Sequence, residues 1–143
     1  MKDPAVVFVM KGHAFPFNGL KDLIGKKGLT MLGYSWGEAV DRFTKEHLDI
    51  IAVTRAQQAF KMLERGRTDF FIYGLYSGSF VARKMGIFDK FESLPHFVSQ
   101  EAVYITFSKK SKYRHLLSRA NDIIQRLREE GTIDRWIEKS LKE

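Results

Sequence analysis

The chain of 143 residues has the length of one ordinary domain, and its 44% hydrophobic share is enough to build a core without disulfides. The absence of cysteine excludes disulfide bonds, thiolate nucleophiles and sulfur-ligated zinc. The formal net charge of +7 is compatible with nucleic-acid binding, but basic residues in the last quarter of the chain alternate with acidic ones along the expected helix faces. We therefore expect no nucleic-acid partner.

Membrane insertion is not expected either. No run approaches the roughly 20 apolar residues that span a bilayer, and the first residues lack the apolar core of a signal peptide. The alternatives are a cytoplasmic protein or a sequence that is part of a longer gene product.

Predicted strands and helices alternate along most of the chain. Strands are expected at 5–10, 28–32, 47–53, 69–73, 91–94 and 102–107, because each run is short, apolar and rich in β-branched or aromatic residues. Helices are expected at 20–24, after 35, at 56–63 and after 74. This order predicts an α/β lobe with right-handed crossovers, a largely parallel sheet and three αβα layers.

Two helix starts carry capping-box patterns. Ser35 is followed three residues later by Glu38, and Thr54 is followed by Gln57. Glu38 is also four residues before Arg42, a spacing that predicts an ion pair on the helix surface.

The end of the chain is purely helical. Apolar residues from Tyr113 to Leu127 form one helical stripe, and Gly131 closes that helix. Thr132 is expected to cap a second helix that turns Trp136 and Leu141 inward. This C-terminal helical hairpin has no strand of its own, so its apolar stripes must be buried on something else.

Catalytic and metal-binding patterns are missing. The four histidines, His13, His47, His96 and His115, lack a second ligand at helical metal spacing. No serine sits in a nucleophile elbow, and no strand is followed by a phosphate-binding lysine loop. We therefore expect no metal, no cofactor and no catalytic residue.

The remaining candidates are positional. In an open α/β sheet, ligands bind beyond the carboxyl ends of the strands, where helix N-termini point outward. Three corners of this kind, at 33–37, 54–56 and 73–75, predict a ligand site, with the alternative that each is only a helix cap. The candidate ligand-binding residues are Gly33, Tyr34, Ser35, Trp36, Thr54, Arg55, Tyr73 and Gly74.

Several segments together resemble the second lobe of the family 3 bacterial extracellular solute-binding proteins. They are Gly19–Leu23, Gly25–Lys27, Gly33–Glu38, Gln57–Leu63, Gly66–Asp69, Tyr104–Ser111, Leu127–Asp134 and Trp136–Ile137. The resemblance implies a periplasmic-binding-protein-like fold in which residues 1–103 form lobe two. Residues 104–143 would be a crossing strand and helices that pack on lobe one, whose N-terminal part would lie upstream.

The resemblance also implies a function. The chain would bind a small polar solute as part of a periplasmic importer or sensor, with a membrane permease or receptor as partner. Amino-acid binders of the family place an aspartate after the strand that ends at Tyr73, where this chain has Gly74. An unpaired ammonium is costly to bury, so together with Arg55 the sequence favours an anionic or aromatic solute.

Other interpretations stay open. Some proteins of this fold are dehydratases such as cyclohexadienyl dehydratase, and the effector domains of LysR-like regulators share the fold class. We favour a binding protein over an enzyme because no acid or base is well placed in this half of a cleft. If residues 113–127 and 133–141 lack their usual partner, we expect them to dock on a second copy, as a homodimer, or on their own lobe.

Overall fold

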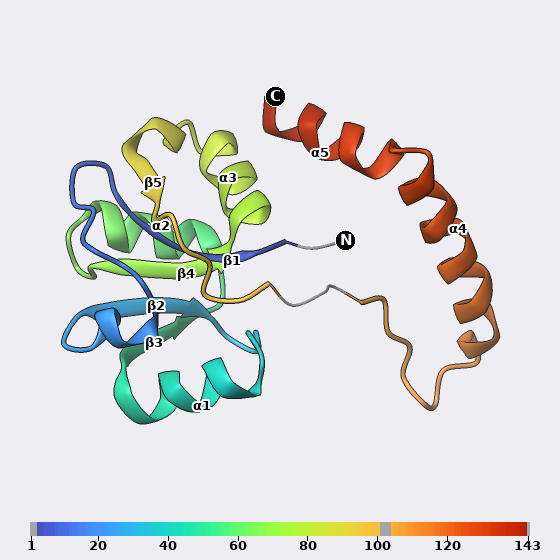
Figure 1. Ribbon diagram of the computed structural model, residues 1–143, viewed down its shortest axis with the longest axis horizontal. Coiled ribbons are helices and arrows are strands. Elements are labelled where there is room, and N and C mark those ends of the chain that lie inside the picture. The colour runs from blue at the N-terminus through green and yellow to red at the C-terminus, as the bar shows by residue number, and fades with distance from the viewer. Residues whose placement is uncertain (1–2, 101–103, 143) are drawn as a thin grey trace. The chain divides into compact units, whose positions relative to one another are not determined.

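The computed structural model describes residues 3–100 and 104–142. The chain divides into two compact units, Lys2–Glu101 and Ala102–Glu143. The first unit contains the sheet and the second contains the C-terminal helices, as the ribbon in Figure 1 shows. Among the described residues, no helix combines the length and the apolar character needed to span a membrane.

The first unit is built on a five-stranded mixed sheet in the order β3-β2-β4-β1-β5. The strands are β1 (Ala5–Met10), β2 (Lys27–Met31), β3 (Asp49–Val53), β4 (Phe70–Gly74) and β5 (Phe91–Ser93). β2 runs parallel to both β3 and β4, as predicted, whereas β1 is antiparallel to β4 and to β5. An apolar run predicts that a strand is buried but not its direction, so the orientation of β1 is decided by its partners.

Helices cover both faces of this sheet (Figure 1). They are α1 (Glu38–His47), α2 (Ala56–Glu64), α3 (Leu75–Lys84) and the short 3-10 turns η1 (Leu20–Leu23) and η2 (Phe88–Lys90). The predicted three-layer αβα lobe is therefore confirmed.

Alternate residues of the central strands point into two separate cores. On β1, Val6 and Phe8 pack with Phe60 of α2, while Val7 on the opposite face packs with Leu23 of η1. All of these side chains are at most 4% exposed. Burial of both faces explains why the strand sequences are continuous apolar runs rather than alternating ones.

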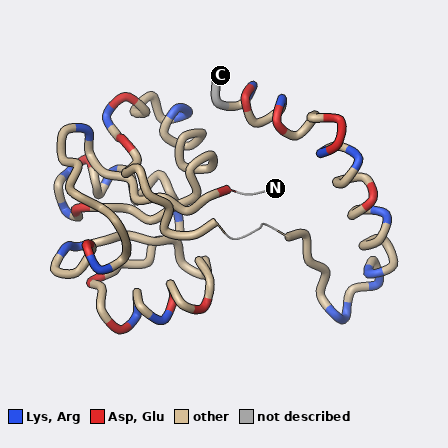
Figure 2. Tube along the Cα trace, in the orientation of Figure 1, with Lys and Arg blue, Asp and Glu red and all other residues tan. Residues whose placement is uncertain are grey.

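The second unit consists of η3 (Arg114–Leu116), α4 (Leu117–Glu129) and α5 (Thr132–Lys142). Basic and acidic residues both recur along α4 and α5, as Figure 2 shows. Gly131 joins the two long helices with φ of 65°, as its position in the sequence suggests. The predicted strand at 102–107 is absent at residues 104–107, and its first two residues lie outside the described chain. Thr132 is the first residue of α5 rather than its cap, and its hydroxyl accepts a hydrogen bond from the Arg135 guanidinium.

Neither predicted capping box forms. Gly37 is the N-cap of α1 and Arg55 is the N-cap of α2, in both cases without a side-chain cap bond. The Ser35 hydroxyl donates instead to an Asp41 carboxylate oxygen at 2.5 Å. The acid that Ser35 contacts is therefore Asp41, one turn after the predicted partner Glu38. Glu38 pairs with Arg42 at 2.6 Å, as its spacing predicts.

Candidate functional site

A glycine turn at the carboxyl end of β2 begins the candidate site. Gly33 has φ of 79°, a left-handed conformation that favours glycine over residues with a side chain. The Tyr34 amide donates to the Met31 carbonyl at 3.2 Å and closes the turn. As a result, the Tyr34 side chain stands 52% exposed at the carboxyl edge of the sheet.

Three aromatic rings gather at this edge. The Tyr34 ring centroid lies 5.5 Å from that of Trp36 and 5.8 Å from that of Tyr73. Trp36 is anchored by its indole N–H, which donates to the Thr30 hydroxyl at 3.1 Å. The residues Tyr34, Trp36 and Tyr73, predicted separately from two corners, therefore form one aromatic wall.

The phenol of Tyr73 is held in its neutral form. Burial raises its pKa above the usual range, and a hydrogen bond with Tyr34 and the nearby charge of Asp3 act in the same direction. Tyr73 is only 7% exposed, so it forms the floor beneath the more exposed Tyr34.

A carboxylate that the sequence did not suggest completes the corner. Because β1 and β4 are antiparallel, Ala5 lies opposite Gly74, and the Leu75 amide donates to the Pro4 carbonyl at 2.9 Å. Asp3 therefore lies over the start of α3. Its carboxylate accepts hydrogen bonds from the Tyr76 amide at 2.8 Å, the Ser77 amide at 3.2 Å and the Ser77 hydroxyl at 2.5 Å.

The same arrangement explains why residue 74 is glycine. A Cβ added to Gly74 would collide with the Asp3 carboxylate. The backbone of Gly74 has φ of −61°, which any residue adopts, so space rather than conformation is the constraint. Sequence reasoning missed Asp3 because no local pattern links the residue before the first strand to a helix more than 70 positions later.

Thr54 and Arg55 follow the carboxyl end of β3, which lies beside the end of β2, because Met31 pairs with Val53 and the Leu32 amide donates to the Val53 carbonyl at 2.8 Å. They line a hollow of about 600 Å³ along α2, and none of the residues from Gly33 to Trp36 borders it. Tyr34 and Trp36, but not Tyr73, border a second hollow, of about 470 Å³, between the sheet and α1. Asp41, Thr44 and Lys45 line that second hollow from α1.

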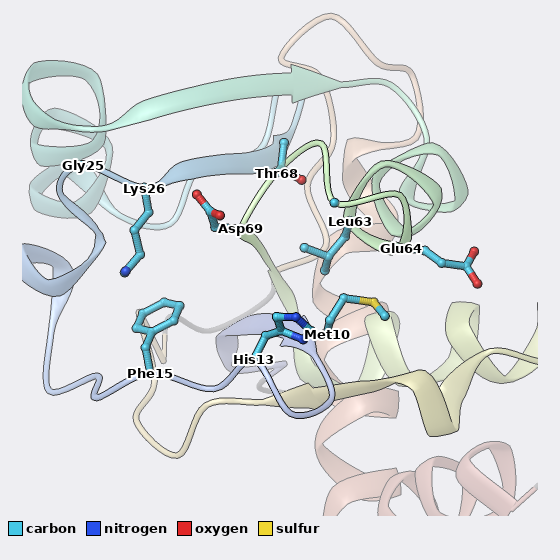
Figure 3. Close-up of a pocket in the computed structure, with 10 residues that line it drawn as sticks. Met10, His13, Phe15, Gly25, Lys26, Leu63, Glu64, Thr68 and Asp69 are labelled. Carbon is cyan, nitrogen blue, oxygen red and sulfur yellow. The ribbon is translucent and has the colours of Figure 1, made fainter.

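A third hollow, of about 630 Å³, lies where β2 and β4 begin and is shown in Figure 3. Lys26, Phe15, Glu64 and Asp69 line it, and the Lys26 ammonium lies 4.4 Å from the centroid of the Phe15 ring. Asp69 accepts a hydrogen bond from the Lys27 amide at 2.7 Å, and Glu64 pairs with Lys90. The carboxylates of this hollow therefore have partners in the fold.

Within residues 3–100 and 104–142, no three histidine or carboxylate side chains come together as a metal site would require. His96 bonds the Phe17 carbonyl and His115 bonds the Lys112 carbonyl.

No protein-family model matches the sequence, and no curated protein matches it. Solved structures do match by fold. A mutant of ArgBP from T. maritima superposes with a TM-score of 0.77 at 22% identity over 100% of this chain and 59% of its own. ArgBP is also known in an arginine-bound form.

Two further structures match different extents of the chain. The GluR0 ligand-binding core in complex with L-glutamate has a TM-score of 0.80 at 15% identity, over 99% of this chain and 61% of its own. Domain 2 of ArgBP from T. maritima has a TM-score of 0.52 at 20% identity, over 62% of this chain and 91% of its own.

This chain thus spans about three fifths of the length of the ArgBP mutant and of the GluR0 core. The match to the isolated domain 2 covers 62% of this chain, which is close to the length of the first unit, Lys2–Glu101. The chain has the periplasmic-binding-protein-like fold of these solute-binding proteins and receptor ligand-binding cores, which confirms at the level of the fold the family 3 resemblance of its sequence.

Proposed function

We propose that the first unit binds a small polar solute at the corner formed by Tyr34, Trp36, Tyr73 and Asp3. The observation that carries this proposal is a carboxylate and an aromatic wall at the carboxyl edge of the sheet, where ligands bind in open α/β folds. Structural neighbours with this fold bind arginine or L-glutamate, which supports solute binding as the general role.

The position of Asp3 changes the expected chemistry of the solute. From the sequence, the glycine at position 74 means that β4 itself ends without a carboxylate, and for this reason an anionic or aromatic solute was expected. Asp3 brings a carboxylate to Gly74 from the neighbouring strand, so an ammonium group has a partner there. We therefore propose a solute with an amino group, which contacts Asp3, and a planar or apolar part, which packs on Tyr34 and Trp36.

The site proposed here is one wall of a cleft. In the proposal the solute is held between this lobe and a second lobe, in a periplasmic importer or a sensor with a permease or receptor as partner. Gly33 and Ser35 shape the turn that carries the wall. Thr54 and Arg55 stay predictions for this cleft.

Isothermal titration calorimetry with the standard amino acids, including L-arginine and L-glutamate, tests the proposal. Asn is as good a helix cap as Asp, so D3N should keep the fold and lose the charge that pairs with an amine. We expect saturable binding by the wild-type chain and a loss of about tenfold or more in D3N.

Tyr113 provides a control, because it is 51% exposed and lies in the other unit. Y113A should bind as the wild type does, and Y34A should bind more weakly. Equal affinities of D3N and the wild type for an amine-bearing ligand would exclude Asp3 from the site.

A further inference from the structure

Basic side chains gather on the outer face of α2. The hollow of about 600 Å³ on this face is lined by Thr54, Arg55, Gln57, Gln58, Lys61, Met62, Arg65 and Arg67. Four of these residues are cations, three are neutral hydrogen-bonding side chains, and none is an acid.

The helical period explains how residues spread over the sequence reach one face. α2 buries Ala56, Ala59, Phe60 and Leu63 against the sheet. Arg55, Gln58 and Arg65 recur at i, i+3 and i+10 and are exposed, while the half-buried Met62 at i+7 borders this side and packs on the core. At a rise of about 1.5 Å per residue, this basic face is about 15 Å long.

The fold separates these cations from the acids that neighbour them in the sequence. Glu64 precedes Arg65 and Asp69 follows Arg67 closely, but both acids line the hollow in Figure 3 instead. Glu64 accepts from the Lys90 ammonium at 2.5 Å, and Asp69 accepts from the Lys27 amide at 2.7 Å. The fold thus places Glu64 and Asp69, which have partners, on one side of the α2 to β4 turn, and Arg65 and Arg67 on the other.

As a result, the cations of the basic face lack a counter-charge among the described residues. Among the ion pairs formed by residues 3–100 and 104–142, none involves Arg55, Lys61, Arg65 or Arg67. The negative end of the helix dipole stabilises Lys61 and Arg65 near the C-terminus of α2. It does not account for Arg55 at the N-cap or for Arg67 beyond the helix.

We propose that the basic face of α2 binds a polyvalent anion that carries phosphate groups. Lys61, Arg65 and Arg67 lie around the C-terminal end of α2, and a single carboxylate would neutralise only one of them. Guanidinium groups bind phosphate oxygens in a bidentate manner, and the amides of Gln57 and Gln58 supply further donors. The phosphate groups come from a soluble polyphosphate-type anion or from several neighbouring headgroups of an anionic lipid surface.

This site does not include the solute corner, because none of Tyr34, Trp36, Tyr73 and Asp3 lines it. Of its cations, Arg65 and Arg67 are not among the residues predicted for the solute cleft, whereas Arg55 is. Variants of Arg65 and Arg67 therefore test the anion site without altering the proposed solute site. Lys11 and Lys21 are exposed and lie outside this hollow, so K11Q/K21Q removes the same charge elsewhere on the same unit.

The experiment titrates tripolyphosphate into the 143-residue chain by calorimetry at low salt, with the wild type, R65Q/R67Q and K11Q/K21Q. We expect saturable binding that R65Q/R67Q weakens by about tenfold or more and K11Q/K21Q leaves nearly unchanged. Circular dichroism confirms that all three are folded.

A parallel sedimentation assay uses vesicles of phosphatidylglycerol, with phosphatidylcholine vesicles as the neutral reference. Binding to phosphatidylglycerol without binding of tripolyphosphate assigns the phosphate to a lipid headgroup, and the reverse assigns it to a soluble anion. Equal affinities for the wild type and R65Q/R67Q, equal weakening in both double variants, or no saturable binding of either probe overturns the proposal.

Discussion

The Asp3 carboxylate accepts a hydrogen bond from the Ser77 hydroxyl at 2.5 Å, although 74 positions separate the two residues in the sequence. Together with the two amide bonds to Tyr76 and Ser77, this contact makes Asp3 the cap of α3 in place of a residue of the helix itself. The antiparallel pairing of β1 with β4 is what brings the residue to this place.

Replacement of Gly74 by alanine should destabilise the protein through Asp3. The added Cβ would displace the carboxylate, so we expect G74A to cost about 1 to 2 kcal/mol of unfolding free energy, the value of a lost helix cap. In a D3A background the cap is already absent, so G74A should cost much less there. Urea denaturation of the four proteins in this double-mutant cycle measures the coupling.

Gly19 serves as the control for that cycle, because its backbone is extended and a Cβ there meets nothing within 4 Å. G19A should leave stability nearly unchanged. A full cost of G74A in the D3A background would show that the glycine is required for another reason.

The turn before α1 should depend on Asp41 rather than on a capping box. Asp41 accepts from the Ser35 hydroxyl at 2.5 Å and from the Trp36 amide at 2.9 Å. We expect D41A to cost about 1 to 2 kcal/mol and S35A less, because S35A leaves the Trp36 bond in place.

E38A tests the same turn from the opposite side. Glu38 forms only an exposed pair with Arg42, so its loss should cost at most about 0.5 kcal/mol. Chemical denaturation ranks the three variants by their loss of unfolding free energy. A larger loss in E38A than in D41A would mean that Glu38 caps the helix as the capping-box pattern predicts.

Stability should fall at alkaline pH in part through Tyr73. Burial and the bond with Tyr34 raise its pKa above the ordinary value of 10.0. The native state then holds the proton to a higher pH than the unfolded state, so this contribution is complete below about pH 10 and is lost as pH rises further. Unfolding free energies measured at about pH 9 and pH 11 should differ less in Y73F than in the wild type.

Tyr113 is the matched control for this measurement, because its side chain is 51% exposed. Y113F should keep the pH dependence of the wild type. A Y73F protein with an unchanged alkaline slope would mean that Tyr73 loses its proton equally easily in both states.

The C-terminal helices should promote self-association. Trp136 is 56% exposed and Ile123 is 41% exposed, and large apolar side chains of this kind favour a partner surface. We expect a dimer or larger species in light scattering, and I123D/W136D should shift it towards the monomer. S118D/S140D adds the same charge at exposed polar positions of the same helices and should not.

Much of the fold is readable from local sequence. The apolar run at 5–10, the helical spacing at 56–63 and the glycine turn at Gly33 all appear as predicted, because each depends on residues a few positions apart. The aromatic residues Tyr34, Trp36 and Tyr73 were also identified as candidates, since strand ends can be located without knowing which strands are neighbours.

The decisive contacts came only with the tertiary structure. Asp3 lies at Gly74 because β1 runs antiparallel to β4. Glu64 and Asp69 lie away from the basic face of α2, where Glu64 contacts Lys90 and Asp69 contacts the Lys27 amide. A local pattern determines which conformations a segment adopts and which side it buries. Contacts between distant segments depend on strand order and direction, which short-range spacing does not encode.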